Sequence, residues 1–300
     1  MSRHSLSLSV LALSLLSTSA LAQPHLPAFE LQRLQFDPGA LGSLVVGTGR
    51  TLDAGVFRAS LQVQYEQSSL SFEEGLLPKG GQSLVEGKFT THLTAAYGVV
   101  SWLQVGAQAP FILNQAGTPT VYAATPAQRG LSTPWVGARA GLLSMKRGAP
   151  LNLALDVSAG LPVGSAAALG REDLMVLPRL QFGFQGEYFQ LGAEAGAILR
   201  KKLDLGEISR REHDIIGNEV RLGATVTSLG GKKTRGELSA LVGLPLDGGR
   251  MSLEALLAIR RHALPWLDLY VLGGPGVSTA LDTPSFRVIA GASFSNAKID

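Results

Sequence analysis

The stretch from Val56 to Glu66 alternates apolar and polar side chains at every position. The apolar residues Phe57, Ala59, Leu61, Val63 and Tyr65 share one parity, and the polar residues Arg58, Ser60, Gln62, Gln64 and Glu66 share the other. Because successive side chains of a strand point to opposite faces, this pattern predicts a strand with one apolar and one polar face. The pattern returns through most of the chain, which predicts an all-β protein.

Further segments repeat the alternation, namely 85–97, 102–113, 133–143, 151–161, 176–187, 189–200, 219–227, 235–244, 250–260, 266–273 and 286–294. The predicted strands therefore number about twelve, and single-chain outer-membrane barrels have an even number. Short and long connections mostly alternate along the chain, which is typical of a barrel with periplasmic turns and longer external loops. The tight Asp-Gly-Gly connection at 245–249 is an exception. In this arrangement both termini are expected in the periplasm.

Residues 1–22 have the pattern of a signal peptide. Arg3 gives a short basic start, residues 6–16 are mostly apolar, and Ala20-Leu21-Ala22 supplies the small residues of a cleavage site. The apolar run is too short for a membrane anchor. The chain has no cysteine, so a lipid-modified N-terminal cysteine, a disulfide and a thiolate metal site are excluded. We expect the mature chain to start near Gln23, outside the cytoplasm.

Composition favours a membrane barrel over a soluble exported protein. Charged residues make up 16% of the chain and the mean hydropathy is +0.20, whereas soluble domains carry about 25% charged residues. After residue 22 no apolar run is long enough for a transmembrane helix, and a closed barrel is the other structure that pairs every backbone group in lipid. A soluble sandwich or barrel would need the apolar parity to fill a core, but that parity is rich in Ala and Leu. The net charge of +3 is too small and dispersed to indicate nucleic acid.

The chain divides into four predicted parts. Residues 1–22 form the signal peptide, 23–54 a periplasmic N-terminal leader, 55–296 a transmembrane antiparallel up-and-down β-barrel of about 12 strands, and 297–300 a short tail. The leader alternates only loosely, and Asp37-Pro38-Gly39 predicts a turn within it. Two other interpretations of 23–54 stay open, a segment tucked into the barrel mouth and a disordered linker.

The polar parity of the predicted strands carries charges of both signs and is expected to face the lumen. These lumen-lining candidates are Arg58, Glu66, Glu86, Lys88, His92, Arg139, Asp156, Arg179, Glu187, Glu194, Arg200, Glu219, Arg221, Arg235, Glu237, Arg250, Glu254, Arg260, Asp268 and Arg287. Twelve strands lie between eight-stranded barrels, which side chains fill, and wide porins of sixteen or more strands. The candidates therefore line a narrow pore or form a salt-bridge network in a closed scaffold. Their cationic excess hints at a mild anion preference.

Aromatic residues gather at the ends of the predicted strands. The candidates for a girdle at the periplasmic ends are Phe57, Tyr97, Trp102, Phe184, Tyr188, Phe189, Trp266 and Phe294, and those at the opposite ends are Tyr65, Phe111 and Trp135. Aromatic rings prefer the headgroup level of a bilayer, so two girdles are expected. The alternative is that they are the ordinary aromatic residues of strands.

Catalytic and cofactor signals are poor. No H-E-x-x-H, G-x-S-x-G or nucleotide-binding motif is present, and 230–234 lacks the P-loop spacing. His92 and Thr94 invite comparison with twelve-stranded outer-membrane phospholipases, which use a His and a Ser on one strand. Thr replaces Ser here and both side chains are expected to face the lumen, so an inert histidine is favoured. We predict no enzyme, no catalytic residues, no cofactor and no metal site.

One resemblance extends over most of the mature chain. Residues 29–52 (FELQRLQFDPGALGSLVVGTGRTL), Gly55–Arg58, Leu93–Gly98 (LTAAYG) and Phe286–Gly291 (FRVIAG) are similar to the N-terminal barrel region of OmpA-family outer-membrane proteins of Gram-negative bacteria. The resemblance implies an outer-membrane barrel. In that family a peptidoglycan-binding domain often follows the barrel; this chain stops at Asp300, so peptidoglycan anchoring is not carried over. The final strand, ending in Phe294, looks like the signal read by the barrel-assembly machinery.

Two functions fit these observations. The first is a small porin-like channel for polar solutes, and the second is a non-conducting OmpA-like barrel that anchors or displays loops. The expected partners are outer-membrane lipid, the barrel-assembly machinery during insertion and, for a channel, a small polar solute.

Overall fold

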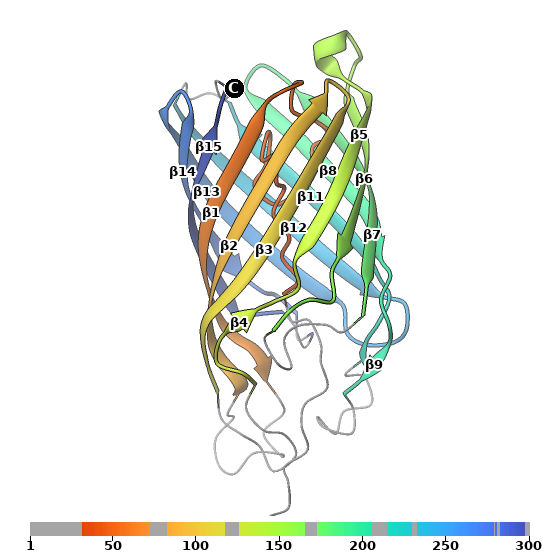
Figure 1. Ribbon diagram of the computed structural model, residues 1–300, viewed down its shortest axis with the longest axis vertical. Helices are drawn as coiled ribbons and strands as arrows, with labels where there is room; N and C mark the ends of the chain where they lie inside the picture. The colour runs from red at the N-terminus through yellow and green to blue at the C-terminus, as the bar shows by residue number, and fades with distance from the viewer. Residues whose placement is uncertain are drawn as a thin grey trace, which may run out of the picture.

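The computed structural model describes residues 32–71, 83–117, 126–165, 173–205, 215–229, 233–278, 280 and 283–297. Within them the chain forms one large antiparallel sheet that closes on itself (Figure 1). Its long strands are β1 (Phe57–Ser71), β2 (Ser83–Val100), β3 (Leu103–Ala116), β5 (Trp135–Leu143), β6 (Asn152–Gly160), β7 (Met175–Gln185), β8 (Phe189–Ile198), β11 (Glu219–Ser228), β12 (Thr234–Pro245), β13 (Ser252–Leu264), β14 (Leu267–Pro275) and β15 (Phe286–Ser295).

Closure follows from the pairing of the first and last strands. β1 pairs with β2 on one side and with β15 on the other, and every other long strand pairs with its neighbours in chain order. The short β4 (Gly130–Leu131) adds to β3, while β9 (Leu203–Asp204) and β10 (Ile215–Ile216) form a separate pair. The predicted up-and-down barrel of about twelve strands is confirmed. Among the described residues no helix is long and apolar enough to cross a membrane.

The two ends of the barrel differ in their connections. Short turns, including the one-turn helix η2 (Met145–Arg147), lie at the end that is uppermost in Figure 1, which we call the turn end. Longer connections lie at the opposite end, the loop end. β1 begins and β15 ends at the turn end, where the Phe57 backbone N–H donates to Asn296 Oδ1 at 2.8 Å.

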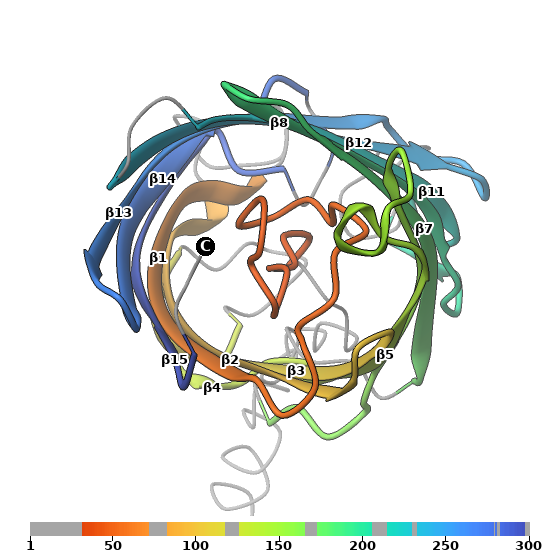
Figure 2. The same ribbon diagram turned by 90° about the horizontal axis from the view of Figure 1, so that it is seen from above.

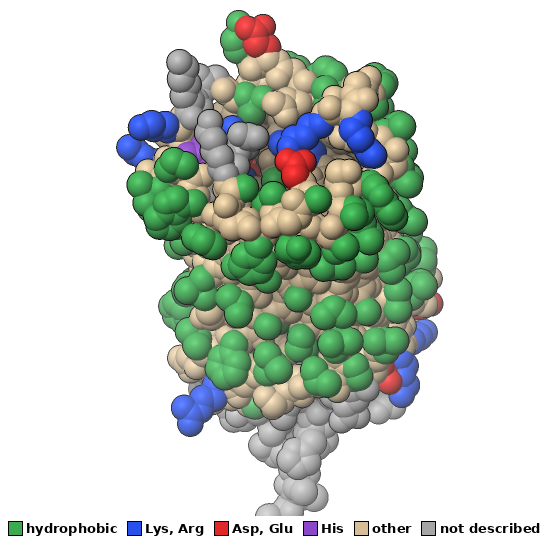
Figure 3. All heavy atoms as spheres, turned by 45° about the horizontal axis from the view of Figure 1, so that its top comes forward, with side chains coloured by type: hydrophobic (Ala, Val, Ile, Leu, Met, Phe, Trp, Pro, Cys, Tyr) green, Lys and Arg blue, Asp and Glu red, His purple; other side chains and the backbone are tan. Residues whose placement is uncertain are grey.

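The apolar parity faces outward and the polar parity faces inward. On β1, Leu61 is 53% exposed, whereas Gln62 and Gln64 are buried. Apolar side chains from neighbouring strands form a broad band around the outside of the barrel (Figure 3). An outward apolar face is the arrangement required in lipid and the reverse of a soluble β-sandwich.

The described part of the predicted leader, residues 32–54, lies inside the barrel (Figures 1 and 2). We call it the N-terminal segment. It has no regular secondary structure, and almost all of its residues from 32 to 49 are buried or half-buried. Gln32 contacts Gln64 and Lys88 in the loop-end half of the barrel, whereas Thr51 bonds to the Ser101 carbonyl at the turn end. The segment therefore runs along the lumen, so the expectation of a leader outside the barrel is corrected for these residues.

An arginine on the outer face should destabilise the barrel according to its depth. Val63 lies about 14 Å along the barrel axis from the start of β1, near the middle of the apolar band. We expect Val63→Arg to lower the free energy of unfolding in lipid by about 2–4 kcal/mol. Val100→Arg, also outward but at the end of β2, should cost about 0–1 kcal/mol. Urea unfolding from lipid vesicles measures both, and equal losses would contradict the outward assignment of the apolar face.

Candidate functional site: the lumen and its N-terminal segment

One side of the N-terminal segment packs against an apolar patch of the barrel wall. The segment contributes Leu34, Phe36, Ala40, Leu44, Val45 and Val46, and the wall contributes Leu256 and Ala258 of β13, Tyr270 and Leu272 of β14, and Ile289 of β15. All of these side chains are buried. Burial of apolar surface on both partners stabilises this contact, so the segment is attached to β13–β15 by a dry interface.

The opposite side of the segment meets charged groups. Asp37 accepts two hydrogen bonds from the Arg139 guanidinium of β5, at 2.9 and 3.2 Å. Arg139 also lies 3.2 Å from Asp156 of β6, which pairs with Arg179 of β7 at 2.7 Å. All four groups are buried, and a bidentate Arg–carboxylate pair is among the stronger polar contacts. Asp37 thus joins the segment to a charge network across three strands.

Two acidic side chains of the wall are held by backbone N–H groups of the segment. Glu237 of β12 accepts hydrogen bonds from the Leu44 N–H at 3.1 and 3.2 Å and from the Ser43 hydroxyl. Glu194 of β8 accepts one from the Gly47 N–H at 2.9 Å. Buried carboxylates need such donors, because leaving them without a partner is costly. The turn at 43–47 is therefore shaped around two glutamates of the wall.

At the loop-end half of the barrel three guanidinium groups share one carboxylate. Arg33 of the segment lies 2.7 Å from Glu219 of β11, Arg221 lies 3.1 Å from it and Arg200 3.5 Å. Arg221 also donates to the Arg33 carbonyl at 3.3 Å. The segment therefore binds the wall near its start, through Arg33, as well as in its middle, through residues 37–47.

The wall also carries ion pairs of its own. Asp268 of β14 binds Arg58 at 2.7 Å and also pairs with Arg260, and Arg260 donates to the Ala40 carbonyl of the segment. In a second set, Glu66 binds Lys88 at 2.6 Å and Arg287 at 2.7 Å, and Arg287 binds Glu254 at 3.1 Å. These charges neutralise one another across neighbouring strands, as buried ions must.

The structure places most of the predicted lumen residues on the inner side. Those that it buries are Arg58, Glu66, Lys88, His92, Arg139, Asp156, Arg179, Arg200, Glu219, Glu237, Glu254, Arg260, Asp268 and Arg287, and Glu194 and Arg221 are partly buried with the partners given above. Arg235, in β12, and Arg250, just before β13, are half-buried.

Two of the predicted lumen residues are exposed instead. Glu86 faces outward because the β1–β2 pairing shifts register between Gln67 and Leu70, so that Val85 and Lys88 are both buried. A bulge of this kind reverses the alternation locally. Glu187 lies in the turn between β7 and β8 rather than in a strand. The alternation pattern alone does not reveal a bulge or an early strand end.

Sequence reasoning missed the apolar residues that face the lumen. Leu256, Ala258, Tyr270, Leu272 and Ile289 occupy inward positions where polar residues were expected. Their counterparts are the apolar residues of the N-terminal segment, which alternation within the strands cannot reveal. The only signal was the small apolar run 42–49, whose partner the sequence left unspecified.

The aromatic residues predicted for the girdle at the turn end lie on the outside. Phe57, Tyr97, Trp102, Phe184, Tyr188, Phe189, Trp266 and Phe294 are all exposed, and all belong to strands or turns at the turn end. Trp266 and Phe294 stack edge-on, with ring centroids 5.7 Å apart. At the other end Phe111 is exposed, but Trp135 is buried toward the lumen beside Met175, Leu177 and Ile198. Trp135 is inward because it shares the parity of Arg139.

His92 and Thr94 both face inward, on β2. His92 Nδ1 lies 3.3 Å from Gln108 Nε2, and the His92 ring packs edge-on against Phe36 of the segment. Thr94 accepts a hydrogen bond from Gln62 at 3.3 Å. The histidine is enclosed by the N-terminal segment, in line with the inert interpretation.

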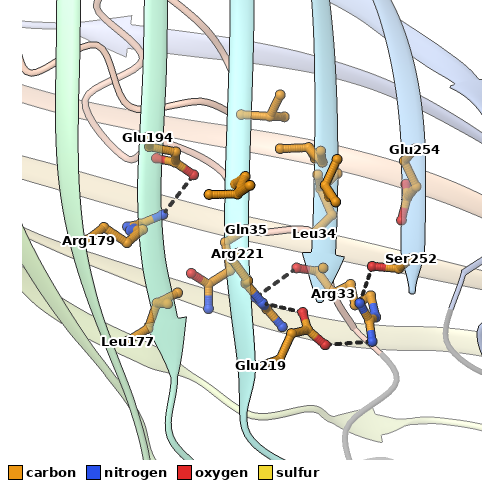
Figure 4. A pocket seen from close by; sticks show the side chains of 15 residues that line it. Arg33, Leu34, Gln35, Leu177, Arg179, Glu194, Glu219, Arg221, Ser252 and Glu254 are labelled. Carbon is orange, nitrogen blue, oxygen red and sulfur yellow. Dashed lines mark hydrogen bonds and ion pairs between the residues drawn. The ribbon is translucent and has the colours of Figure 1, made fainter. Parts of the chain in front are cut away.

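Two cavities lie between the middle of the N-terminal segment and the wall, and a third, of about 50 Å³, lies at the turn end among Leu41, Arg50, Leu52, Arg58, Lys146 and Ser295. The first, of about 50 Å³, lies among Arg33, Leu34 and Gln35 of the segment and Leu177, Arg179, Glu219 and Arg221 of the wall (Figure 4). The second, of about 30 Å³, lies among Gln35, Phe36 and Pro38 of the segment and Gln104, Gln108, Arg139 and Asp156 of the wall. Gln35 and Arg179 line both.

Comparison with known proteins identifies the fold. No protein-family model matches the chain, and neither does any curated protein. Among solved structures, the chain is similar to the COG4313 outer membrane channel from Pseudomonas putida F1, with a TM-score of 0.61 and 15% identity, covering 87% of this chain and 100% of that one. It is also similar to the NanC porin, with a TM-score of 0.53 and 11% identity, covering 79% and 98%. The fold is therefore that of outer-membrane β-barrels.

Loss of the Asp37 carboxylate should loosen the N-terminal segment. Removing one partner of a buried ion pair costs about 3–5 kcal/mol, and we expect the lower value because Arg139 keeps Asp156. In a Val45→Cys background, Asp37→Ala should speed the reaction of the buried thiol with a maleimide at least about tenfold. Asp53→Ala is the matched control, because Asp53 and Lys146 form an exposed pair worth about 0–1 kcal/mol. Equal rates in the two variants would contradict this role of Asp37.

Proposed function

We propose that the protein is a small porin-like channel for polar solutes, closed by residues 32–54 in this structure. One observation carries the proposal: a separate segment of chain, rather than side chains of the wall, fills the lumen. On most sides that segment is held by ion pairs and backbone hydrogen bonds, which water can replace. Release of the polar side would open a path lined by charged residues.

Glycines in the wall support a dedicated seat for the segment. A side chain at Gly183 of β7 would place its Cβ 2.0 Å from the Thr48 carbonyl oxygen, and one at Gly192 of β8 would lie 2.7 Å from Thr48 Cγ2. The first contact is with backbone and leaves no room for a Cβ, whereas the second would require the neighbouring threonine methyl to shift. The wall is therefore thinned where the segment passes, as expected for a removable part and unnecessary in a barrel that its own side chains fill.

The similar structures support a channel as well. One is described as an outer membrane channel and the other as a porin. At 11–15% identity the similarity concerns the fold alone. For this chain the proposed channel function therefore rests on the lumen described above.

The remaining expectations from the sequence belong to the same proposal. We place the mature chain in the outer membrane, exported by residues 1–22 and inserted by the barrel-assembly machinery, with its apolar band in contact with lipid. Kinship with the OmpA family rests on the sequence motifs alone. The transported solute is proposed as small and polar because charged and amide side chains line the inner face.

A closed scaffold is the second candidate. It is favoured by the size of the cavities, about 50 and 30 Å³, which leave no open pore for a solute while the segment is in place. The two functions differ in whether the segment moves.

A disulfide can test that movement, because the chain has no cysteine of its own. A Cβ at position 192 lies 3.6 Å from Thr48 Cβ, within the usual separation for a disulfide. We expect Thr48→Cys/Gly192→Cys to lose its large openings in planar bilayers when oxidised and to regain them after reduction. Thr48→Cys alone under the same oxidant, and the double variant before oxidation, control for the substitutions themselves. Identical openings before and after reduction would favour the scaffold.

A further inference from the structure

We infer that the closed barrel keeps a narrow path for small inorganic ions along one side of the N-terminal segment, with its tightest point between Gln35 and Arg179. This inference rests on the proposed channel function and deepens it, because it concerns the state in which larger solutes are excluded.

The segment touches the wall unequally around its circumference. Toward β13–β15 the contact is made by buried apolar side chains of one cluster, which includes Leu44 of the segment and Leu272 and Ile289 of the wall. Ions do not cross such a contact, because an apolar interface offers no replacement for their water. Any path for ions therefore runs on the other side, where the segment faces β3 to β12.

Both cavities follow one another along the barrel and are lined mainly by strands β3 to β12, although the first also borders Leu34 and Val45 of the apolar cluster and Ser252 and Glu254 of β13. The first reaches Ser252 and Glu219, at the loop-end starts of β13 and β11. The second reaches Gln104 and Arg139, in the turn-end parts of β3 and β5. Charged side chains of both signs line each cavity beside apolar ones, so ions find polar partners at several points along it.

Gln35 and Arg179 line both cavities, so these two side chains stand between them. Arg179 is fixed by Asp156 at 2.7 Å and by Glu194 at 3.7 Å, so the wall side of the junction is held in place. Gln35 comes from the segment, and its buried Nε2 has no hydrogen-bond partner within the described part of the chain. An amide that lacks an acceptor at the junction of two polar cavities is a ready ligand for water or an anion.

The dimensions restrict what can pass. A water molecule needs about 10–15 Å³ of cavity volume. The first cavity, of about 50 Å³, therefore holds roughly four waters, and the second, of about 30 Å³, roughly two. That suits small inorganic ions that keep part of their hydration, and it excludes solutes of sugar size. Gln35 therefore sets the resting ion conductance, and Arg179 sets its charge preference.

The test compares resting conductance between variants at two lumen glutamines. We expect Gln35→Ala to raise the resting conductance in potassium chloride at least about twofold, without permeability to arabinose in liposome swelling. Modification of Gln35→Cys by a methanethiosulfonate reagent should reduce the resting conductance by more than half. Arg179→Gln should shift the selectivity toward cations, because Glu194 then loses its guanidinium partner and Asp156 keeps only Arg139. Gln62→Ala and Gln62→Cys are the matched controls, since Gln62 is buried in the lumen but lines neither cavity.

The outcomes separate this inference from the channel proposal. Equal resting conductance in Gln35→Ala and the wild type, or an equal rise in Gln62→Ala, overturns the side path. If the Thr48→Cys/Gly192→Cys variant still gains large openings on reduction in that case, the channel function still stands. Absence of conductance in every variant, with the barrel folded by heat-modifiable migration on gels, overturns both.

Discussion

The width of the barrel is the constraint on which the rest of the structure depends. A closed sheet of twelve strands pairs its backbone groups without leaving an edge, as lipid requires, but it encloses more space than the wall side chains fill. Residues 32–54 occupy the surplus. The shape of the lumen, its charge pairing and its residual cavities all follow from how this segment fits.

Charge pairing explains why the segment sits where it does. Buried carboxylates such as Glu237 and Glu194 receive donors from the segment backbone, and Arg139 receives Asp37 as a second acid. An ion left unpaired in a closed barrel is costly, whereas the same ion in an open, hydrated lumen is not. The lumen seen in the structure therefore depends on the segment for part of its electrostatic balance, which water would have to supply in the proposed open channel.

The apolar contact gives the arrangement its asymmetry. Leu256, Tyr270 and Ile289 hold one side of the segment through the hydrophobic effect, which is insensitive to the hydration of charges. The other side is held by polar contacts and is bordered by both cavities. A segment attached in this way can loosen on its polar side while it stays docked on its apolar side.

The barrel could be predicted from the amino-acid pattern: period-two alternation from Phe57 to Phe294 located every long strand, because one face of each strand is apolar. The same alternation placed residues such as Arg58, Arg139 and Asp268 on the inner face, because the face that a residue takes is set by its position within its own strand. What fills the lumen could be seen only in the folded molecule, because the ion pair of Asp37 with Arg139 and the apolar cluster of the segment with Leu272 and Ile289 join residues far apart in the chain. For the same reason the inward Leu272, and the exposed Glu86 beside its bulge, were beyond the reach of a pattern read along one strand.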